Sequence, residues 1–385
     1  LRWSGHKRRG VYLYEIILII NKMILTAGPS ITQKEIEYVT DAITNGHGEH
    51  WADYIKKFEK SFAEYIGVKY ALSTSSCTGA LHLALVALGV GKGDEVIIPD
   101  CSWIATASSI CYTGATPVFA DVLPDTWCIN PNSIEKNITE RTKAIMPVHL
   151  YGHPAEMGVI KGIAIRYNLK IVEDAAPSVG TELCWKKTGS FGDIGCFSFQ
   201  GAKLLSTGEG GMLVTNNTEL FEKVKHYSEH GRLGTGFDIS HIGFKYKMSN
   251  LQAAMGLAQL ERVDELVMKK RLLYQCYKEN LECVNGISLN KVSTQFERPN
   301  YWMTSIILEE DFNILRDGVM LKLKERNIDT RPFFPPISSF PMFKDANNSV
   351  STYIGQNGIN LPSGHNLTYE EVVYICNTIK EILGV

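Results

Sequence analysis

The chain has 385 residues, a formal net charge of −2 at pH 7 and 44% hydrophobic residues. These values are typical of a soluble globular protein with a large domain and a smaller one. A nearly neutral charge disfavours a broad nucleic-acid-binding surface. The nine cysteines stand singly, without a C-x-x-C pair. This pattern indicates neither a zinc site nor a disulfide framework, and we expect reduced thiols in a cytoplasmic protein.

Residues 1–22 differ in character from the rest of the chain. They begin with Leu1 and a basic patch, followed by a short apolar run that Glu15 interrupts. The run is too short to span a bilayer and no small-residue cleavage site follows it, so we expect no membrane attachment. Because Met23 opens a segment typical of a protein start, we interpret residues 1–22 as a non-native or upstream extension that is at most weakly ordered.

Between about residues 70 and 245, short β-rich runs alternate with helical patterns. The apolar strand-like runs include residues 94–100, 116–122, 142–152 and 169–176. Apolar strands that alternate with helices indicate an α/β fold with a mostly parallel sheet covered on both faces. In such sheets, ligands bind at the carboxyl ends of the strands.

The pattern changes after about residue 245. Residues 250–281 form one long helical stretch, and shorter strand and helix signals follow to the C-terminus. We therefore predict a large domain at residues 23–262 and a small α+β domain at residues 263–385, hinged on the long helix. The first residues of the large domain are expected to pack partly with the small one.

Three features fall where parallel strands are predicted to end. Ser76 and Thr78 lie at a strand-to-helix turn, where hydroxyls and free amides suit a phosphate, although simple N-capping explains them too. Trp103 follows a strand and would either stack on a flat ring or join the core. Asp174 ends an apolar strand, where a buried carboxylate needs a cationic partner, which an ordinary ion pair would also provide.

A fourth feature is Lys203, in the stretch "FSFQGAKLLSTGEGGM". The lysine precedes the glycines, which is the wrong order for a P-loop, and taken alone it would be a solvated surface lysine. The four features together fit pyridoxal phosphate. This cofactor needs a phosphate site, an aromatic neighbour, an acid beside its ring nitrogen and a lysine for its aldehyde.

Longer motifs support this interpretation. They are "GDEVIIP", "EDAA", "SFGDIGCFSF", "AKLLSTGEGGM" and "MSNLQAAMGLAQLERVDE". With these motifs the chain resembles the DegT/DnrJ/EryC1/StrS family of pyridoxal-phosphate-dependent sugar aminotransferases over nearly all of residues 23–385. The segments "YWMTSIIL", "RDGVMLKLKERNIDTRPFFPP", "FPMF" and "GINLPS" look most like the perosamine synthases of that family, which aminate GDP-4-keto-6-deoxymannose.

The resemblance implies a fold-type-I, aspartate-aminotransferase-like architecture with a mostly parallel seven-stranded sheet and a smaller C-terminal α+β domain. It also implies a homodimer with shared active sites, L-glutamate as amino donor, a keto sugar nucleotide as acceptor and a 4-amino sugar for surface polysaccharide as product. No metal is expected, because the sequence has no metal-binding cluster.

Roles for individual residues follow from the resemblance. Lys203 would form the Schiff base, Asp174 would face the ring nitrogen and Trp103 would stack on the ring. The remaining expected contacts are the phosphate contacts of Ser76, Cys77, Thr78 and Ser198, the cofactor contact of Pro177, the phosphate contact of Lys245 from the partner subunit, and the substrate contacts of His149, Arg331 and Asn360.

Several positions depart from the family pattern. Cys77 replaces a glycine at the phosphate turn, Pro177 replaces a Gln or Glu near the cofactor's phenolic oxygen, and Lys245 replaces an asparagine. The entry stretch "NGHGEHWADYIKKFE" also lacks the usual S-x-G. These changes leave open an acceptor of another kind, a smaller phosphorylated ketone. They also leave open a non-catalytic regulatory protein, whereas Lys203 argues against the dehydrating relatives, which carry histidine there.

Overall fold

The computed structural model describes residues 23–233, 236–292, 294–309 and 312–385. The predicted extension at residues 1–22 therefore lies outside the described residues. Within the described part of the chain, none of the helices is both long and apolar enough to cross a membrane.

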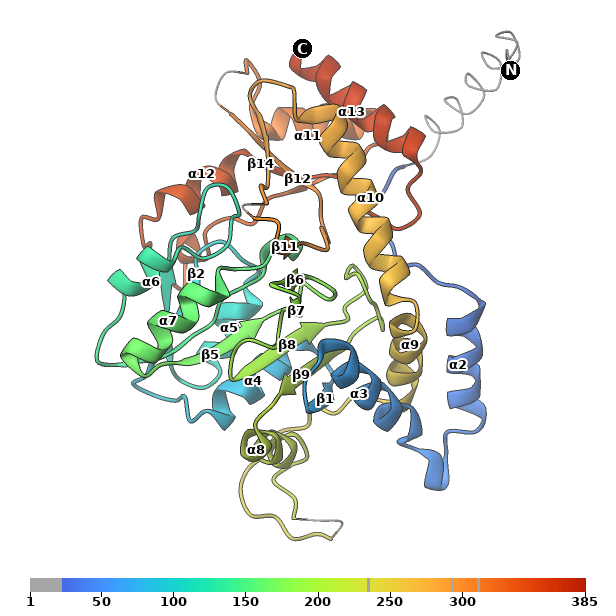
Figure 1. Ribbon diagram of the computed structural model, residues 1–385, viewed down its shortest axis with the longest axis vertical. Helices are drawn as coiled ribbons and strands as arrows, with labels where there is room; N and C mark the ends of the chain where they lie inside the picture. Colours follow the sequence, from blue (N-terminus) through green and yellow to red (C-terminus); the bar gives the residue numbers. More distant parts are fainter. Residues whose placement is uncertain (1–22, 234–235, 293, 310–311) are drawn as a thin grey trace.

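A seven-stranded sheet forms the centre of the larger part of the molecule (Figure 1). Six of the seven strands point in the same direction, and β9, between β1 and β8, runs antiparallel to both, so the predicted mostly parallel sheet is confirmed. The strand order is β1 (Tyr70–Thr74), β9 (Gly211–Thr215), β8 (Ile194–Ser198), β5 (Lys170–Asp174), β4 (Thr142–Ile145), β2 (Glu95–Pro99) and β3 (Thr116–Ala120).

Helices cover both faces of this sheet. Successive strand residues point to opposite faces, so Ile171 and Val172 of β5 belong to two different hydrophobic clusters. Burial on both sides explains why these strands are apolar throughout. One face packs against α4 (Cys77–Ala87), α5 (Ala105–Cys111) and α8 (Thr218–Ser228), and the other against α3 (Asp53–Ile66), α6 (Pro131–Lys136), α7 (Met157–Tyr167) and α9 (Asn250–Leu260).

The prediction of a single long helix at residues 250–281 is wrong. The structure has two helices, α9 and α10 (Val263–Leu281), separated at Glu261 and Arg262. The backbone of Arg262 leaves the helical region at φ −113° and ψ 7°. Its guanidinium donates to Oε1 of Glu35, at 2.7 Å, on α2 (Gln33–Thr44). The N-terminal segment therefore holds the chain at this corner.

The C-terminal part forms a second layer, an antiparallel sheet beside α10, α11 (Arg316–Glu325) and α13 (Tyr369–Leu383) (Figure 1). Ile24 makes a parallel bridge to Ile328 and is buried in this layer's core. The second sheet has the order β10 (Ile287–Leu289), β12 (Ser305–Leu308), β14 (Gly358–Asn360) and β13 (Arg331–Pro332).

Short elements connect the two layers. Helix α12 (Ser349–Asn357) places Ile354 in the core of the large sheet. A small sheet joins a strand from the C-terminal half to two that lie between β5 and β8 in the chain, in the order β11 (Glu297–Arg298), β6 (Glu182–Leu183) and β7 (Lys186–Lys187). Single 3-10 turns occupy Gly48–His50, Leu150–Gly152 and Ile337–Ser339.

Candidate active site

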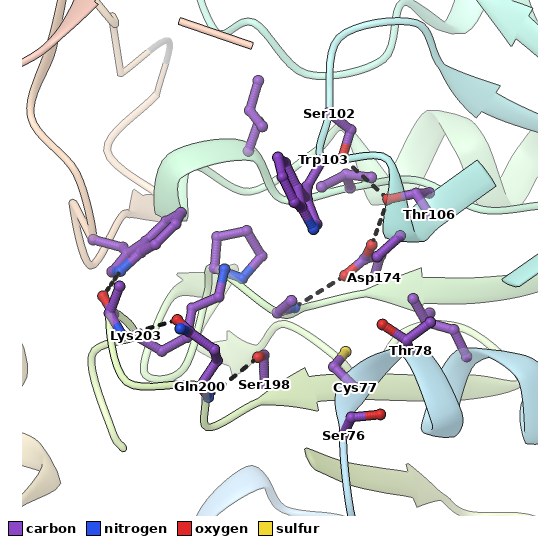
Figure 2. Close-up of a pocket in the computed structure, with 18 of the residues that line it drawn as sticks. Ser76, Cys77, Thr78, Ser102, Trp103, Thr106, Asp174, Ser198, Gln200 and Lys203 are labelled. Carbon is purple, nitrogen blue, oxygen red and sulfur yellow. Dashed lines mark hydrogen bonds between the residues drawn. The ribbon is translucent and has the colours of Figure 1, made fainter. Parts of the chain in front are cut away.

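A cavity of about 430 Å³ opens where β5 and β8 end and α4 begins. It therefore lies at the carboxyl ends of parallel strands, as the sequence predicts. Figure 2 shows Trp103, Asp174, Lys203 and the turn residues before α4 around one space. Its wall consists of Ser76, Cys77, Thr78, Leu81, Ser102, Trp103, Ala105, Thr106, Val148, Leu150, Asp174, Ala176, Pro177, Ser198, Gln200, Ala202, Lys203, Glu209, Trp302 and Phe334.

The turn before α4 offers hydroxyl and amide groups to the cavity. Ser76 is the N-cap of α4, and its Oγ accepts the N–H of Gly79 at 3.1 Å. The remaining N–H groups of a first helical turn have no acceptor within the helix, and the helix dipole favours an anion there. Gly211 permits the close approach of β9, because a Cβ atom there would lie 2.6 Å from the backbone nitrogen of Cys77.

Asp174 is a buried carboxyl at the end of β5. Thr106 Oγ1 donates to its Oδ2 at 2.8 Å, and the N–H of Ala176 donates to Oδ1 at 3.2 Å. Burial raises the pKa of Asp174, although these donors and the charge of Lys203 oppose the rise. No cation among the described residues forms an ion pair with it, so the ordinary-ion-pair interpretation is not supported and the carboxyl is free for a cationic ligand.

Lys203 lies five residues beyond Ser198, the last residue of β8, and its side chain lines the cavity (Figure 2). The side chain is half-buried rather than solvated. Burial lowers the pKa of Lys203 to about 8, although the charges of Asp174 and Cys77 act in the opposite direction. An amine that titrates near neutral pH can both bond covalently to an aldehyde and carry a proton.

Trp103 closes the cavity from the side of β2. Its side chain is 62% exposed, so it does not belong to the core. The ring of Phe334, from the C-terminal part of the chain, lies 6.0 Å from it between centroids. An exposed indole at the mouth of a cavity with polar walls is suited to stacking on a flat ring.

Comparison with known proteins matches residues 29–380 to the model of the DegT/DnrJ/EryC1/StrS aminotransferase family. The chain belongs to this family. It is 42% identical to GDP-perosamine synthase of Escherichia coli O157:H7, over 94% of this chain and 98% of that protein, and 37% identical to GDP-perosamine synthase of Vibrio cholerae, over 93% and 98%. The putative sugar aminotransferase Spr1654 from Streptococcus pneumoniae in its PLP form has a similar structure. Its TM-score is 0.88 at 26% identity, over 94% of this chain and 98% of that one.

As a member of the family, the chain is a pyridoxal-phosphate-dependent aminotransferase with the type I fold. The chemical groups that line the cavity also fit pyridoxal phosphate. The capped turn at Ser76 suits the phosphate, the unpaired carboxyl of Asp174 suits a protonated ring nitrogen, and the half-buried amine of Lys203 suits the aldehyde.

Eight of the residues predicted for the site line the aminotransferase cavity: Ser76, Cys77, Thr78, Trp103, Asp174, Pro177, Ser198 and Lys203. Burial raises the pKa of the Cys77 thiol. Ser198, on β8, accepts the N–H of Gln200 at 3.4 Å. Ser76 caps the helix and also lines the cavity, and its phosphate contact stays a prediction.

Two predicted substrate residues do not reach the cavity, because their polar groups are used elsewhere. His149 is wholly buried; its Nδ1 accepts the N–H of Ala155, so its Nε2 donates to Glu173 at 3.0 Å. The amide of Asn360 is buried between Ser305 and Tyr151. The polar groups of His149 and Asn360 are thus engaged within this chain, and their expected substrate contacts stay predictions.

Two further predicted residues lie outside this cavity on the surface. Arg331 is exposed and pairs with Asp329 at 3.0 Å. Its position does not support the expected substrate contact within this chain. Lys245 is exposed and is absent from the cavity wall of its own chain, which is consistent with the expectation that it serves a partner subunit but does not test it.

Several residues of the cavity are not among those predicted from the sequence. Thr106 and Ser102 stand four residues apart, and their hydroxyls lie 3.1 Å from each other beside Asp174. That spacing at the start of a helix was a usable signal. Trp302 and Phe334 arrive from the C-terminal part, and nothing local in the sequence places them opposite Lys203. No cluster of metal-binding side chains occurs among the described residues.

Proposed function

We propose that the enzyme transfers an amino group from L-glutamate to the keto group of a 4-keto-6-deoxy sugar nucleotide such as GDP-4-keto-6-deoxymannose. The observation that carries this proposal is the match to GDP-perosamine synthase of E. coli, 42% identical over nearly the full length of both chains. The presence of Lys203 and Asp174 in one cavity supports it. The product would be a 4-amino sugar for a surface polysaccharide.

Bound pyridoxal phosphate supplies an electron-withdrawing ring that stabilises charge on the carbon that loses its proton. The turn at Ser76, Cys77 and Thr78 would hold the phosphate group, with Ser198 beside it. Trp103 would cover the ring and exclude water from one face. Pro177, which lines the same cavity, would lie near the phenolic oxygen.

Two residues would handle protons. Asp174 would keep the proton on the ring nitrogen, because a buried carboxylate is stabilised by a cationic partner. Lys203 would accept the proton from the α-carbon of the amino donor and later donate one at the sugar carbon that receives the amine. Its pKa of about 8 leaves both protonation states accessible near neutral pH.

We also propose a homodimer in which Lys245 of each chain contributes to the other chain's phosphate site. Its exposure, away from its own cavity, supports this arrangement. Next to it, the carbonyl of Tyr246 accepts the N–H of Ser75 at 2.6 Å. The segment that carries Lys245 is thus anchored on the turn before α4 of its own chain.

The decisive experiment loads the enzyme with the amine form of the cofactor and offers a panel of keto sugar nucleotides and one small phosphorylated ketone. We expect GDP-4-keto-6-deoxymannose to return the visible absorbance of the aldehyde form and to gain one amino group by mass. Amination of the phosphorylated ketone, with no sugar nucleotide accepted, would establish the alternative acceptor and overturn the proposal. Lys203→Ala serves as the inactive control.

A further inference from the structure

The indole ring of Trp302 lies against the amine of Lys203. Trp302 stands between β11 and β12 in the C-terminal part of the chain, and Nζ of Lys203 is 3.7 Å from the ring centroid. That amine has no hydrogen bond or ion pair with any residue in the described part of the chain. A protonated amine over the face of tryptophan is attracted by the negative potential of the ring.

The ring is held in this position from several directions. Its Nε1–H donates to the carbonyl of Ala202 at 2.7 Å, and its backbone N–H donates to Oδ1 of Asn300 at 2.8 Å. The backbone carbonyl of Trp302 accepts from buried Lys270 at 3.0 Å. Tyr151 stacks on the indole at 6.1 Å between centroids. With 6% exposure and these contacts, the ring has no freedom to turn away.

The backbone on both sides of Lys203 is also held. The carbonyl of Ala202 is occupied by the indole, and Nε2 of the buried His365 lies 3.1 Å from the carbonyl of Leu204. The N–H of Lys203 donates to Gln200 at 2.8 Å. Because the neighbouring peptides are fixed, movement of the amine is confined to the lysine side chain, which pivots between the ring face and the rest of the cavity.

We propose that the face of Trp302 is the docking position of the Lys203 amine whenever that amine is not bonded to the cofactor. An aminotransferase lysine must leave the aldehyde, carry a proton and return. A fixed aromatic face keeps the released amine oriented and near the reacting atoms without a competing hydrogen bond. The inference rests on the family's aminotransferase activity, and on neither the sugar nor the amino donor proposed above.

The docking position has a measurable consequence for the protonation of Lys203. The ring favours the charged amine over the neutral one, as do Asp174 and Cys77, which line the same cavity together with Glu209. Burial favours the neutral amine. Without the ring face, one of the interactions that favour the charged amine is lost while burial still favours the neutral one. The midpoint of the Lys203 titration should therefore fall by about one pH unit.

The test measures covalent capture of pyridoxal phosphate by the full-length apoenzyme as a function of pH. In that step the nitrogen lone pair of the neutral amine adds to the aldehyde carbon and one water leaves, so the rate follows the neutral fraction of Lys203. We expect Trp302→Leu to lower the midpoint by about one pH unit and to slow capture at the plateau, because the amine is no longer oriented. Trp302→Phe, which keeps an aromatic face, should retain a midpoint near that of the unsubstituted chain.

Trp185→Leu is the matched control, since Trp185 is 73% exposed and is not part of the cavity wall. It should change neither quantity. An unchanged midpoint in Trp302→Leu, or an equal shift in Trp302→Phe, would overturn the docking role and leave Trp302 as a packing residue. Neither a sugar nor glutamate is present, so failure of the proposed function leaves this result unaffected.

A second measurement avoids any dependence on the folding of Trp302→Leu. Fluorinated tryptophan, incorporated at all six tryptophans, weakens the negative potential of the ring while nearly preserving its shape. The midpoint should fall stepwise as fluorine atoms are added to the unsubstituted chain, and should stay constant in Trp302→Phe. A midpoint that is insensitive to fluorine in the unsubstituted chain would contradict the proposal.

Discussion

Asp174 shows how one residue prepares the cavity for a cation. Its carboxyl is buried and accepts from Thr106 and Ala176, yet no side-chain cation of the described residues pairs with it. Asp174→Asn keeps the shape and removes the charge. Because a charged hydrogen bond contributes about 1.5–3 kcal/mol, affinity of the apoenzyme for pyridoxal phosphate should fall about ten- to hundredfold.

Titration of the apoenzyme by fluorescence measures that affinity. Asp345→Asn, at an exposed carboxyl that caps the N–H of Asn347, is the control and should bind normally. Equal affinity in Asp174→Asn and the unsubstituted chain would show that the carboxyl has no part in binding the ring nitrogen.

Cys77 illustrates the difference between lining a cavity and being reactive. Its side chain is 9% exposed, and burial, followed by the charge of Asp174, raises the pKa of its thiol. Since the thiolate is the nucleophile, iodoacetamide at neutral pH should spare Cys77 and modify the exposed Cys184 and Cys283. Mass spectrometry of peptides identifies the labelled cysteines, and the unfolded chain, in which every cysteine reacts, provides the reference. Labelling of Cys77 as fast as Cys184 would contradict the buried-thiol account.

At this scale the sequence predicts residues that stand directly after strands. Asp174 is the last residue of β5 and Lys203 follows β8 by five residues, and the cavity contains both. Trp302 escaped prediction because its role depends on packing of the C-terminal part against the hairpin of Lys203. The hydrogen bond between His149 and Glu173 escaped prediction for a related reason. Glu173 is on β5, which pairs with the strand β4 that precedes His149, and strand pairing is not visible in a local pattern.

The junction of α9 and α10 shows the limit of pattern reading for whole elements. Apolar residues continue at helical spacing through residues 250–281, which predicts one helix. At the break, Arg262 is hydrogen-bonded to Glu35, more than two hundred residues earlier in the chain, and such a contact is not visible in a local pattern. We propose that this corner is the boundary between the large domain, residues 23–262, and the small domain, residues 263–385.

The contact between Glu35 and Arg262 also predicts how the stability of the folded protein depends on pH. Burial alone would raise the pKa of Glu35, but hydrogen bonds from Thr32 and Arg262 outweigh burial and lower it from 4.5 to about 2. A carboxyl with a lowered pKa stabilises the folded state above pH 4.5, and this contribution is lost as the pH falls from about 4.5 to about 2. Glu35→Gln should therefore reduce the free energy of unfolding by about 1.5–3 kcal/mol at pH 7.

Urea unfolding at several pH values checks this expectation. The difference between Glu35→Gln and the unsubstituted chain should shrink as the pH approaches the folded-state pKa. Glu37→Gln, at an exposed position of the same helix, should have almost no effect at any pH. A deficit in Glu35→Gln that stays constant down to pH 2.5 would mean that its origin is packing rather than charge.

For the whole molecule, the class of sheet was predictable and its order was not. Apolar strands alternating with helices indicate a parallel sheet, but nothing local states that β9 inserts between β1 and β8 with the opposite direction. That insertion matters for the site. It turns the chain back through a hairpin after β8, which places Lys203 beside the end of β5, and it brings Gly211 under the turn before α4.

The proposed dimer can be tested through Lys245, which is exposed and does not line the cavity of its own chain. If Lys245 completes the partner's phosphate site, Lys245→Ala should weaken pyridoxal phosphate binding about tenfold, because one charged contact is lost.

Hybrid dimers of one Lys203→Ala chain and one Lys245→Ala chain then test whether the site is shared between subunits. In a hybrid, one site combines both defects while the other keeps an intact Lys203 and receives Lys245 from its partner. At limiting cofactor, random mixing should restore about a quarter of the unsubstituted activity, since half of the dimers are hybrids with one intact site. Mixtures no more active than the sum of the separate variants would place Lys245 in its own chain's site or in none.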